Sequence, residues 1–122
     1  MNIKIGSKIF LNSDQKEFAE ASKDYNKIHI DGIISRKLIF GSQIVHGVNT
    51  LLTALIFLST TKKNIKIKNI SCNFYKPIYL KKKINFYLNE KNNEYYIYVK
   101  SGNIVNSIFH INKLDLQLKL NI

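Results

Sequence analysis

The chain has 122 residues, a formal net charge of +11 and one cysteine, Cys72. This length suits one domain with a single core and is too short for separate catalytic and cofactor domains. A lone cysteine excludes an internal disulfide and a metal site built from several thiolates of one chain.

The positive charge is compatible with a polyanionic partner such as nucleic acid, a phosphate-bearing coenzyme or an acidic protein. The lysines are scattered, apart from Lys62-Lys63 and Lys81-Lys82-Lys83, and lysine, isoleucine and asparagine are abundant throughout, as AT-rich codons produce. The sequence has no basic helix, zinc-binding pattern or aromatic RNA-binding motif to accompany the charge. We therefore expect no nucleic-acid partner.

Apolar side chains alternate weakly near the N-terminus, at Ile3, Ile5, Ile9 and Leu11. They predict a short strand that ends near Asn12. Ser13 or Asp14 is then expected to cap a helix that ends near Lys23, because Asp14 and Glu17 have the spacing of a capping box. No basic segment precedes a long apolar run, so we expect no signal peptide and a cytoplasmic protein.

Residues 24–41 predict a loop, because polar side chains, Gly32 and Gly41 interrupt any helical period. A helix is predicted from residue 43 to about residue 59. This segment is apolar on nearly every face, so we expect it to be buried nearly all round. Its apolar stretch, residues 44–58, includes polar side chains and is shorter than the roughly 20 residues that a bilayer requires, so we expect no membrane contact.

The pattern after Thr60 is typical of strands, which we predict at residues 65–75, 84–88, 95–99 and 104–122. Turn sequences at residues 91–93 and 101–103 predict hairpin connections. Leucines alternate with polar residues from Leu114 to the end, as in a half-buried antiparallel strand. An antiparallel sheet that curls around one buried helix satisfies this pattern compactly, which is the hot-dog fold of the α+β class. We expect residues 1–122 to form one such domain, and its exposed sheet edges favour a homodimer.

Two groups of polar and glycine residues are spaced as in a known family. The first group comprises Ser22, Asp24, Asn26, His29 and Asp31, and the second comprises Phe40, Gly41, Ile44, His46 and Gly47. They resemble the S-G-D-x-N-P-x-H-x-D and F-G-x-x-I-x-H-G motifs of the MaoC-like (R)-specific enoyl-CoA hydratases and dehydratases. Residues 74–77 also resemble the F-x-K-P strand end of that family. A long match at fixed spacing is a stronger signal than a three-residue motif.

The sequence departs from the family at three loop positions. Lys23, Lys27 and Ser35 stand where the family has glycine, proline and alanine. These changes alter the stiffness of the loop and leave every acid–base group in place.

The resemblance implies that Asp24 and His29 are the catalytic pair. In the family's reaction, water adds to a trans-2-enoyl thioester or leaves an (R)-3-hydroxyacyl thioester. A carboxylate can hold and deprotonate a water, while a histidine exchanges a proton with the α carbon. Taken singly, Asp24 would be a loop-capping residue and His29 a surface or core-edge histidine; their shared spacing favours catalysis.

Gly47, Asn26 and Phe40 are the predicted substrate-binding residues. Gly47 lies at the predicted helix start, where free N–H groups stabilise a thioester oxygen as it becomes enolate-like. Simple helix-start packing is the alternative for Gly47. Asn26 is expected to hold the loop through bonds to the backbone, and Phe40 either lines an acyl tunnel or fastens the loop to the core.

The remaining polar residues of interest have predicted structural roles. Asp31 is expected to tie the loop, His46 to anchor the helix start, and His110 to have no neighbours of chemical interest. The spacing of His29, His46 and Asp31 is possible for zinc, but the resemblance accounts for them, and we expect no metal and no cofactor.

The expected partner is an acyl thioester of coenzyme A or of acyl carrier protein. Candidates for contact with its phosphates are Lys76, Lys81, Lys82 and Lys83, and a solvated basic surface is the alternative for these lysines. Two alternatives stay open: a hot-dog thioesterase, which would release free thiol, and a non-catalytic acyl-binding subunit, which would bind without turnover.

Overall fold

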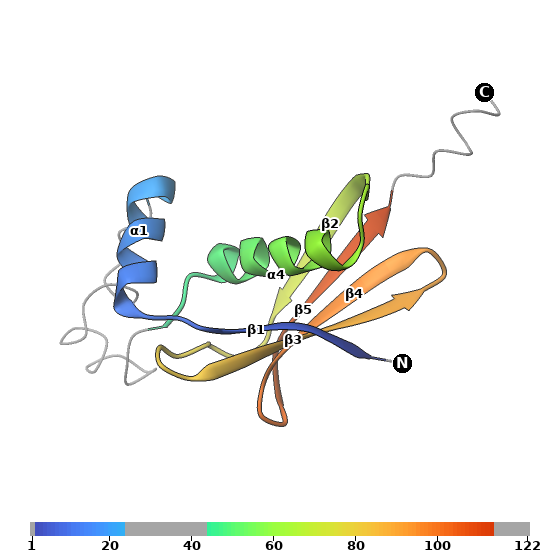
Figure 1. Ribbon diagram of the computed structural model, residues 1–122. Helices are drawn as coiled ribbons and strands as arrows, with labels where there is room; N and C mark the ends of the chain where they lie inside the picture. Colours follow the sequence, from blue (N-terminus) through green and yellow to red (C-terminus); the bar gives the residue numbers. More distant parts are fainter. Residues whose placement is uncertain (1, 24–43, 114–122) are drawn as a thin grey trace.

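The computed structural model describes residues 2–23 and 44–113. Within these ranges, one antiparallel sheet has the strand order β1-β3-β4-β5-β2, and α4 lies along one of its faces (Figure 1). This arrangement confirms the predicted hot-dog fold of the α+β class. The elements are β1 (Ile3–Ile9), α1 (Asn12–Ser22), α4 (Gly47–Thr61), β2 (Ile67–Phe74), β3 (Lys83–Lys91), β4 (Glu94–Ser101) and β5 (Ile104–Lys113).

The core lies between α4 and the three central strands. Ala54 and Leu58 of α4 are buried against inward-facing side chains of the sheet. Because successive side chains of a strand point to opposite faces, every second residue of these strands reaches the core. The inward set comprises Ile84, Phe86, Leu88, Tyr95, Ile97, Val99, Phe109 and Ile111.

The predicted hairpins are confirmed at both central connections. Asn92 and Asn93 have φ of 53° and 62° in the turn between β3 and β4, and Gly102 has φ of 59° between β4 and β5. Residues in the left-handed region match the right-handed twist of the flanking strands. The predicted final strand continues only to Lys113 in the described part, and the alternation at 114–122 lies outside it.

The predicted cap of α1 was wrong, whereas its end was confirmed. The helix begins at Asn12 with Leu11 as N-cap, and Asp14 lies inside the first turn. There the Asp14 carboxylate accepts a hydrogen bond from the Leu11 N–H at 2.7 Å, so it serves the helix start from its third position. Lys23 ends the helix in the left-handed conformation, and its N–H donates to the Ala19 carbonyl at 2.8 Å.

Helix α4 begins later than predicted. The prediction continued an apolar run backwards from Gly47, but Ile44 forms a β-bridge with Tyr79, and the Val45 N–H donates to the Ile78 carbonyl at 2.8 Å. These strand-like contacts with a distant segment hold residues 44–45 outside the helix. Gly47 is therefore the first helical residue, in agreement with the prediction that it lies at the helix start.

The prediction that this helix is buried nearly all round was also wrong for the single chain. Thr50, Ala54 and Leu58 form a buried stripe. The stripe on the opposite side is open: Val48, Leu52 and Ile56 are 57%, 46% and 62% exposed. The sheet covers only one side of α4, and residues spaced four apart share a side.

Two further features frame the site. β2 is an edge strand of the sheet, and its Ile67 and Phe74 are exposed. At the other side, β1 passes α4 at Gly6, where a Cβ would lie 2.6 Å from the Phe57 ring, so only glycine fits there without a shift.

Neither of the two helices within the described ranges is long and apolar enough to cross a membrane.

Candidate functional site

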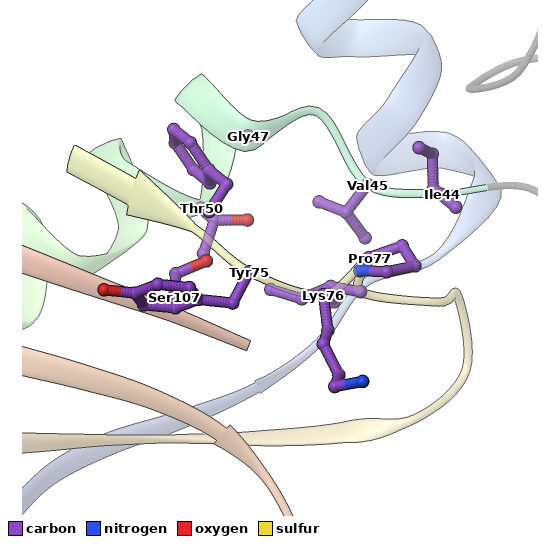
Figure 2. A pocket seen from close by; sticks show the side chains of 10 residues that line it. Ile44, Val45, Gly47, Thr50, Tyr75, Lys76, Pro77 and Ser107 are labelled. Atoms are coloured by element: carbon purple, nitrogen blue, oxygen red, sulfur yellow. The ribbon is translucent and has the colours of Figure 1, made fainter. Parts of the chain in front are cut away.

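A pocket of about 320 Å³ lies at the start of α4, which we call the helix-start pocket. Gly47 and Thr50 form its helical side, and the segment that follows β2 forms the facing wall (Figure 2). Its lining is mostly apolar, with contributions from Val45, Phe74 and Ile78. A mostly apolar pocket with a few fixed polar groups is the usual form of a small-molecule site.

Gly47 allows an aromatic ring to pack against the first turn of α4. A Cβ at this position would lie 2.9 Å from Cε1 of Phe74, so a larger residue would displace the ring. The Phe74 ring is held from its other side by Phe109, at 5.6 Å between ring centroids. His46 precedes the helix as N-cap and forms no side-chain cap. The helix start therefore presents backbone N–H donors beside a glycine, with the positive end of the helix dipole.

Two buried hydroxyl groups line the same pocket, and sequence reasoning missed both. Thr50 and Ser107 are each 1% exposed. The Thr50 hydroxyl donates to the His46 carbonyl at 3.4 Å. Helical spacing was an available signal for Thr50, because it lies one turn after Gly47. Ser107 had no such signal, since it reaches the pocket through its pairing with Phe74 across β5 and β2.

The wall formed by residues 75–77 is fixed by Asn106, which is 3% exposed. The Asn106 carbonyl accepts hydrogen bonds from the N–H groups of Tyr75 and Lys76, at 2.8 and 3.1 Å. Its side-chain amide donates to the Pro77 carbonyl at 3.1 Å, and its side-chain oxygen accepts from the Ser101 hydroxyl at 2.8 Å. This one buried residue thus links the wall to β5 and to the end of β4.

Gly47 is the predicted site residue that the described structure places at the pocket. The predicted catalytic residues Asp24 and His29, and the predicted binding residues Asn26 and Phe40, lie outside the described residues, as does Asp31.

The end of α1 lies next to the start of α4. Phe18, Ser22, His46 and Gly47 line a second, small pocket of about 190 Å³, and the rings of Phe18 and His46 are 4.7 Å apart. His46 is buried there, in agreement with its predicted role as an anchor of the helix start. Ser22, the last residue of α1, therefore lies beside Gly47.

The prediction that His110 has no neighbours of chemical interest was wrong, because the register of β4 and β5 gives it close neighbours. Its ring stacks on the Tyr96 ring with 4.4 Å between the ring centroids, and its Nε2 lies 2.9 Å from Oε2 of Glu94. That hydrogen bond lowers the pKa of Glu94, and the Tyr96 hydroxyl, which donates to Glu94 at 3.1 Å, has a raised pKa because it faces the carboxylate. These side chains alternate with the buried ones, so they lie on the sheet face away from α4.

Cys72 is a small residue beside the core. It is half-buried and packs against the core cluster, and burial raises the pKa of its thiol. Among the described residues, no group of three or more His, Cys, Asp and Glu side chains could hold a metal ion.

The family model for the MaoC like domain matches residues 4–108. This chain belongs to the MaoC-like domain family. The match extends from β1 into β5 and includes the helix-start pocket. No curated protein matches the chain.

Several solved structures share the fold of this MaoC-like domain. An (R)-hydratase from A. caviae involved in PHA biosynthesis is 18% identical, with a TM-score of 0.76 and 91% of each chain covered. The unliganded R-hydratase PhaJ1 from Pseudomonas aeruginosa is 15% identical, with a TM-score of 0.80, covering 91% of this chain and 77% of its own. The HadBC complex of Mycobacterium tuberculosis, a 3R-hydroxyacyl-ACP dehydratase, is 11% identical, with a TM-score of 0.79 and coverage of 93% and 95%.

Proposed function

We propose that this chain is a hydratase or dehydratase of acyl thioesters. It adds water to a trans-2-enoyl thioester or removes water from an (R)-3-hydroxyacyl thioester. The observation that carries this proposal is the apolar pocket at the glycine-led start of α4, in a MaoC-like domain that has Asp24 and His29 at the family's spacing.

The proposed reaction uses one acid–base pair and one backbone donor. Asp24 holds and deprotonates the water, whose oxygen forms the bond to carbon 3 while the π electrons move toward the thioester oxygen. His29 delivers a proton to carbon 2, and proton exchange through solvent then moves the proton held by Asp24 back to His29, so one water is added overall and no electrons are exchanged with a cofactor. Ser22 lines a pocket together with Gly47, and Asp24 follows Ser22 by two residues, which supports a location of this pair near the helix start.

In this mechanism, the backbone N–H of Gly47 donates to the thioester oxygen. One such donor typically contributes about 3 to 4 kcal/mol in the transition state. The apolar lining of the helix-start pocket favours a hydrocarbon acyl chain. Asn26 holds the catalytic loop and Phe40 borders the acyl chain, as the motif match suggests. Coenzyme A and acyl carrier protein are the proposed carriers.

We also propose that residues 1–122 form one domain that functions as a homodimer. The α4 stripe of Val48, Leu52 and Ile56 is exposed, and β2 is an edge strand of the sheet. Burial of these side chains against a second copy would remove an apolar surface from water. Residues 4–108, which match the family, leave only short segments at either end.

The proposed function is tested with a short enoyl-CoA as substrate. We expect loss of the enoyl absorbance without release of free thiol; release of thiol would instead identify a thioesterase. Asp24→Asn and His29→Gln should each lower the rate by at least about a hundredfold, because each removes half of the acid–base pair. His110→Gln is the control, since His110 lies on the opposite sheet face, and it should keep the wild-type rate. Near-full activity of a folded Asp24 or His29 variant would remove that residue from the mechanism.

A further inference from the structure

A further cavity, of about 540 Å³, lies beside the helix-start pocket, and we call it the lysine pocket. The two cavities share the wall of Tyr75, Lys76 and Pro77. The lysine pocket is completed by Lys82 and Lys83 and by the turn between β4 and β5. An apolar cavity and a cationic cavity therefore adjoin across one short segment.

Among the described residues, no acidic side chain in the lining offsets the charge of the lysine pocket. Lys76, Lys82 and Lys83 line it, and the described residues that line it include no Asp or Glu. Within the described ranges, the ion pairs involve other lysines. Like charges in a concave surface raise the local potential and attract anions. In Figure 2 the Lys76 side chain extends away from Gly47 and α4.

The run Lys81-Lys82-Lys83 is divided by the structure. Lys82 and Lys83 line the cavity, whereas Lys81 does not. Lys81 instead occupies the turn with φ of 63°, and its N–H donates to the Phe10 carbonyl at 2.9 Å. The chain therefore contains its own control: an adjacent lysine of equal charge, outside the cavity.

The shared wall has a fixed position because Asn106 holds the backbone of residues 75–77 through both its backbone carbonyl and its side-chain amide. A ligand that spans the two cavities would therefore cross a rigid partition, with Gly47 on one side and the ammonium groups on the other. Preorganised sites bind with less loss of side-chain freedom.

We propose that the lysine pocket binds a phosphate of the thioester's carrier arm. This inference rests on the proposed function: with the acyl chain in the helix-start pocket and the thioester oxygen at Gly47, the arm that carries phosphate extends past the shared wall. The shared chemistry is the phosphate of the pantetheine arm, present in both coenzyme A and acyl carrier protein. Lysine binds phosphate as a point charge.

The decisive experiment compares two substrates that have the same thioester and differ in phosphate. These are crotonyl-CoA and crotonyl-N-acetylcysteamine, and the variant is Lys82→Gln/Lys83→Gln. We expect kcat/KM for crotonyl-CoA to fall about tenfold, mostly through KM, as loss of uniform binding does. The rate with crotonyl-N-acetylcysteamine should not change, and Lys81→Gln should behave as wild type with both substrates. An equal effect on both substrates, or an equal effect of Lys81→Gln, would overturn the proposal.

Two further substrates identify which phosphate is bound. With crotonyl-phosphopantetheine, a retained penalty in the double variant assigns the pantetheine phosphate, whereas a lost penalty assigns the nucleotide phosphates of coenzyme A. With a crotonylated acyl carrier protein, a penalty shows that the same pocket serves protein-bound substrate. Each of these penalties should shrink as salt is raised, because screening weakens the attraction.

Calorimetric binding of coenzyme A separates this inference from the proposed function. If wild type hydrates neither thioester but binds coenzyme A, and only the double variant binds it more weakly, the phosphate site stands and the hydratase does not. If wild type hydrates both thioesters with no dependence on phosphate or on Lys82 and Lys83, the hydratase stands and the phosphate site does not. Thermal unfolding of each variant verifies that the fold is retained.

Discussion

Asn106 is a single residue that fixes the wall between the helix-start pocket and the lysine pocket. Its side chain contacts both the Pro77 carbonyl and the Ser101 hydroxyl, and it is buried. Nothing in the sequence distinguishes it from the many other asparagines of this chain, because its role arises from partners at positions 75–77 and 101. It is the kind of site residue that appears only when strands are placed in register.

We predict that Asn106→Ala destabilises the fold by about 1 to 3 kcal/mol, because it leaves buried polar groups without their partner. Denaturant unfolding measures this change. KM for the enoyl thioester should rise as well, since the wall of both cavities loosens. Asn73→Ala, at an exposed position of β2, should leave both quantities close to wild type. Equal stabilities of the two variants would contradict the role assigned to Asn106.

Glu94 gives the stability of the fold a dependence on pH. The hydrogen bond with His110 lowers the pKa of Glu94 in the folded state. An acid whose folded pKa is depressed stabilises the fold above its unfolded pKa, about 4.3 for glutamate, and loses that contribution as the pH falls through the folded value.

We therefore predict that wild type is more stable than Glu94→Gln near neutral pH and that this difference disappears in acid. Urea unfolding at a series of pH values from neutral to acidic measures the difference. In a His110→Gln background the same Glu94 substitution should show a much smaller pH dependence. A difference that stays constant down to strongly acidic pH would show that the pair does not lower the Glu94 pKa.

Some secondary-structure elements could be predicted from the sequence, and others could not. β3 and β4 alternate between buried and more exposed residues, β5 does so from Ser107 onward, and the turns between them have residues suited to hairpins, so local chemistry and the final fold agree. The start of α4 could not be placed, because Ile44 and Val45 continue the apolar run and are held in an extended state by Ile78 and Tyr79. Tertiary contacts of this kind override a local pattern.

The exposed stripe of α4 leads to a prediction at the same scale. Leu52→Lys places a charge in the proposed interface with a second copy, and burying an unpaired charge is costly. We expect light scattering to show a dimer for wild type and a monomer for this variant at micromolar concentration.

The control for this substitution is Ile3→Lys. It introduces the same charge at an exposed isoleucine of β1, at the opposite edge of the sheet, and should remain dimeric. A monomeric wild type with full activity, or loss of the dimer in both variants, would contradict the assignment of this face.

For the molecule as a whole, the candidate site was only partly visible in the sequence. Gly47 could be found because it belongs to the family motif. Thr50, Ser107 and Asn106 carry no motif: Thr50 and Ser107 reach the helix-start pocket through helix rotation and the β2–β5 register, and Asn106 lines the lysine pocket. Asp24 and His29 rest on the motif match, so their roles stay predictions that the variants above test.

The strand order has a consequence for how the chain folds in time. β3, β4 and β5 follow one another through two tight turns, whereas the edge strands β1 and β2 join from outside this meander. Short loops close at a lower entropic cost than long ones, which favours early formation of the meander. The wall at residues 75–77 follows β2, so it reaches Asn106 only when that edge is added. A ligand in either cavity therefore binds only the completed fold, and it stabilises the native state by an amount that grows with the ratio of free ligand concentration to Kd.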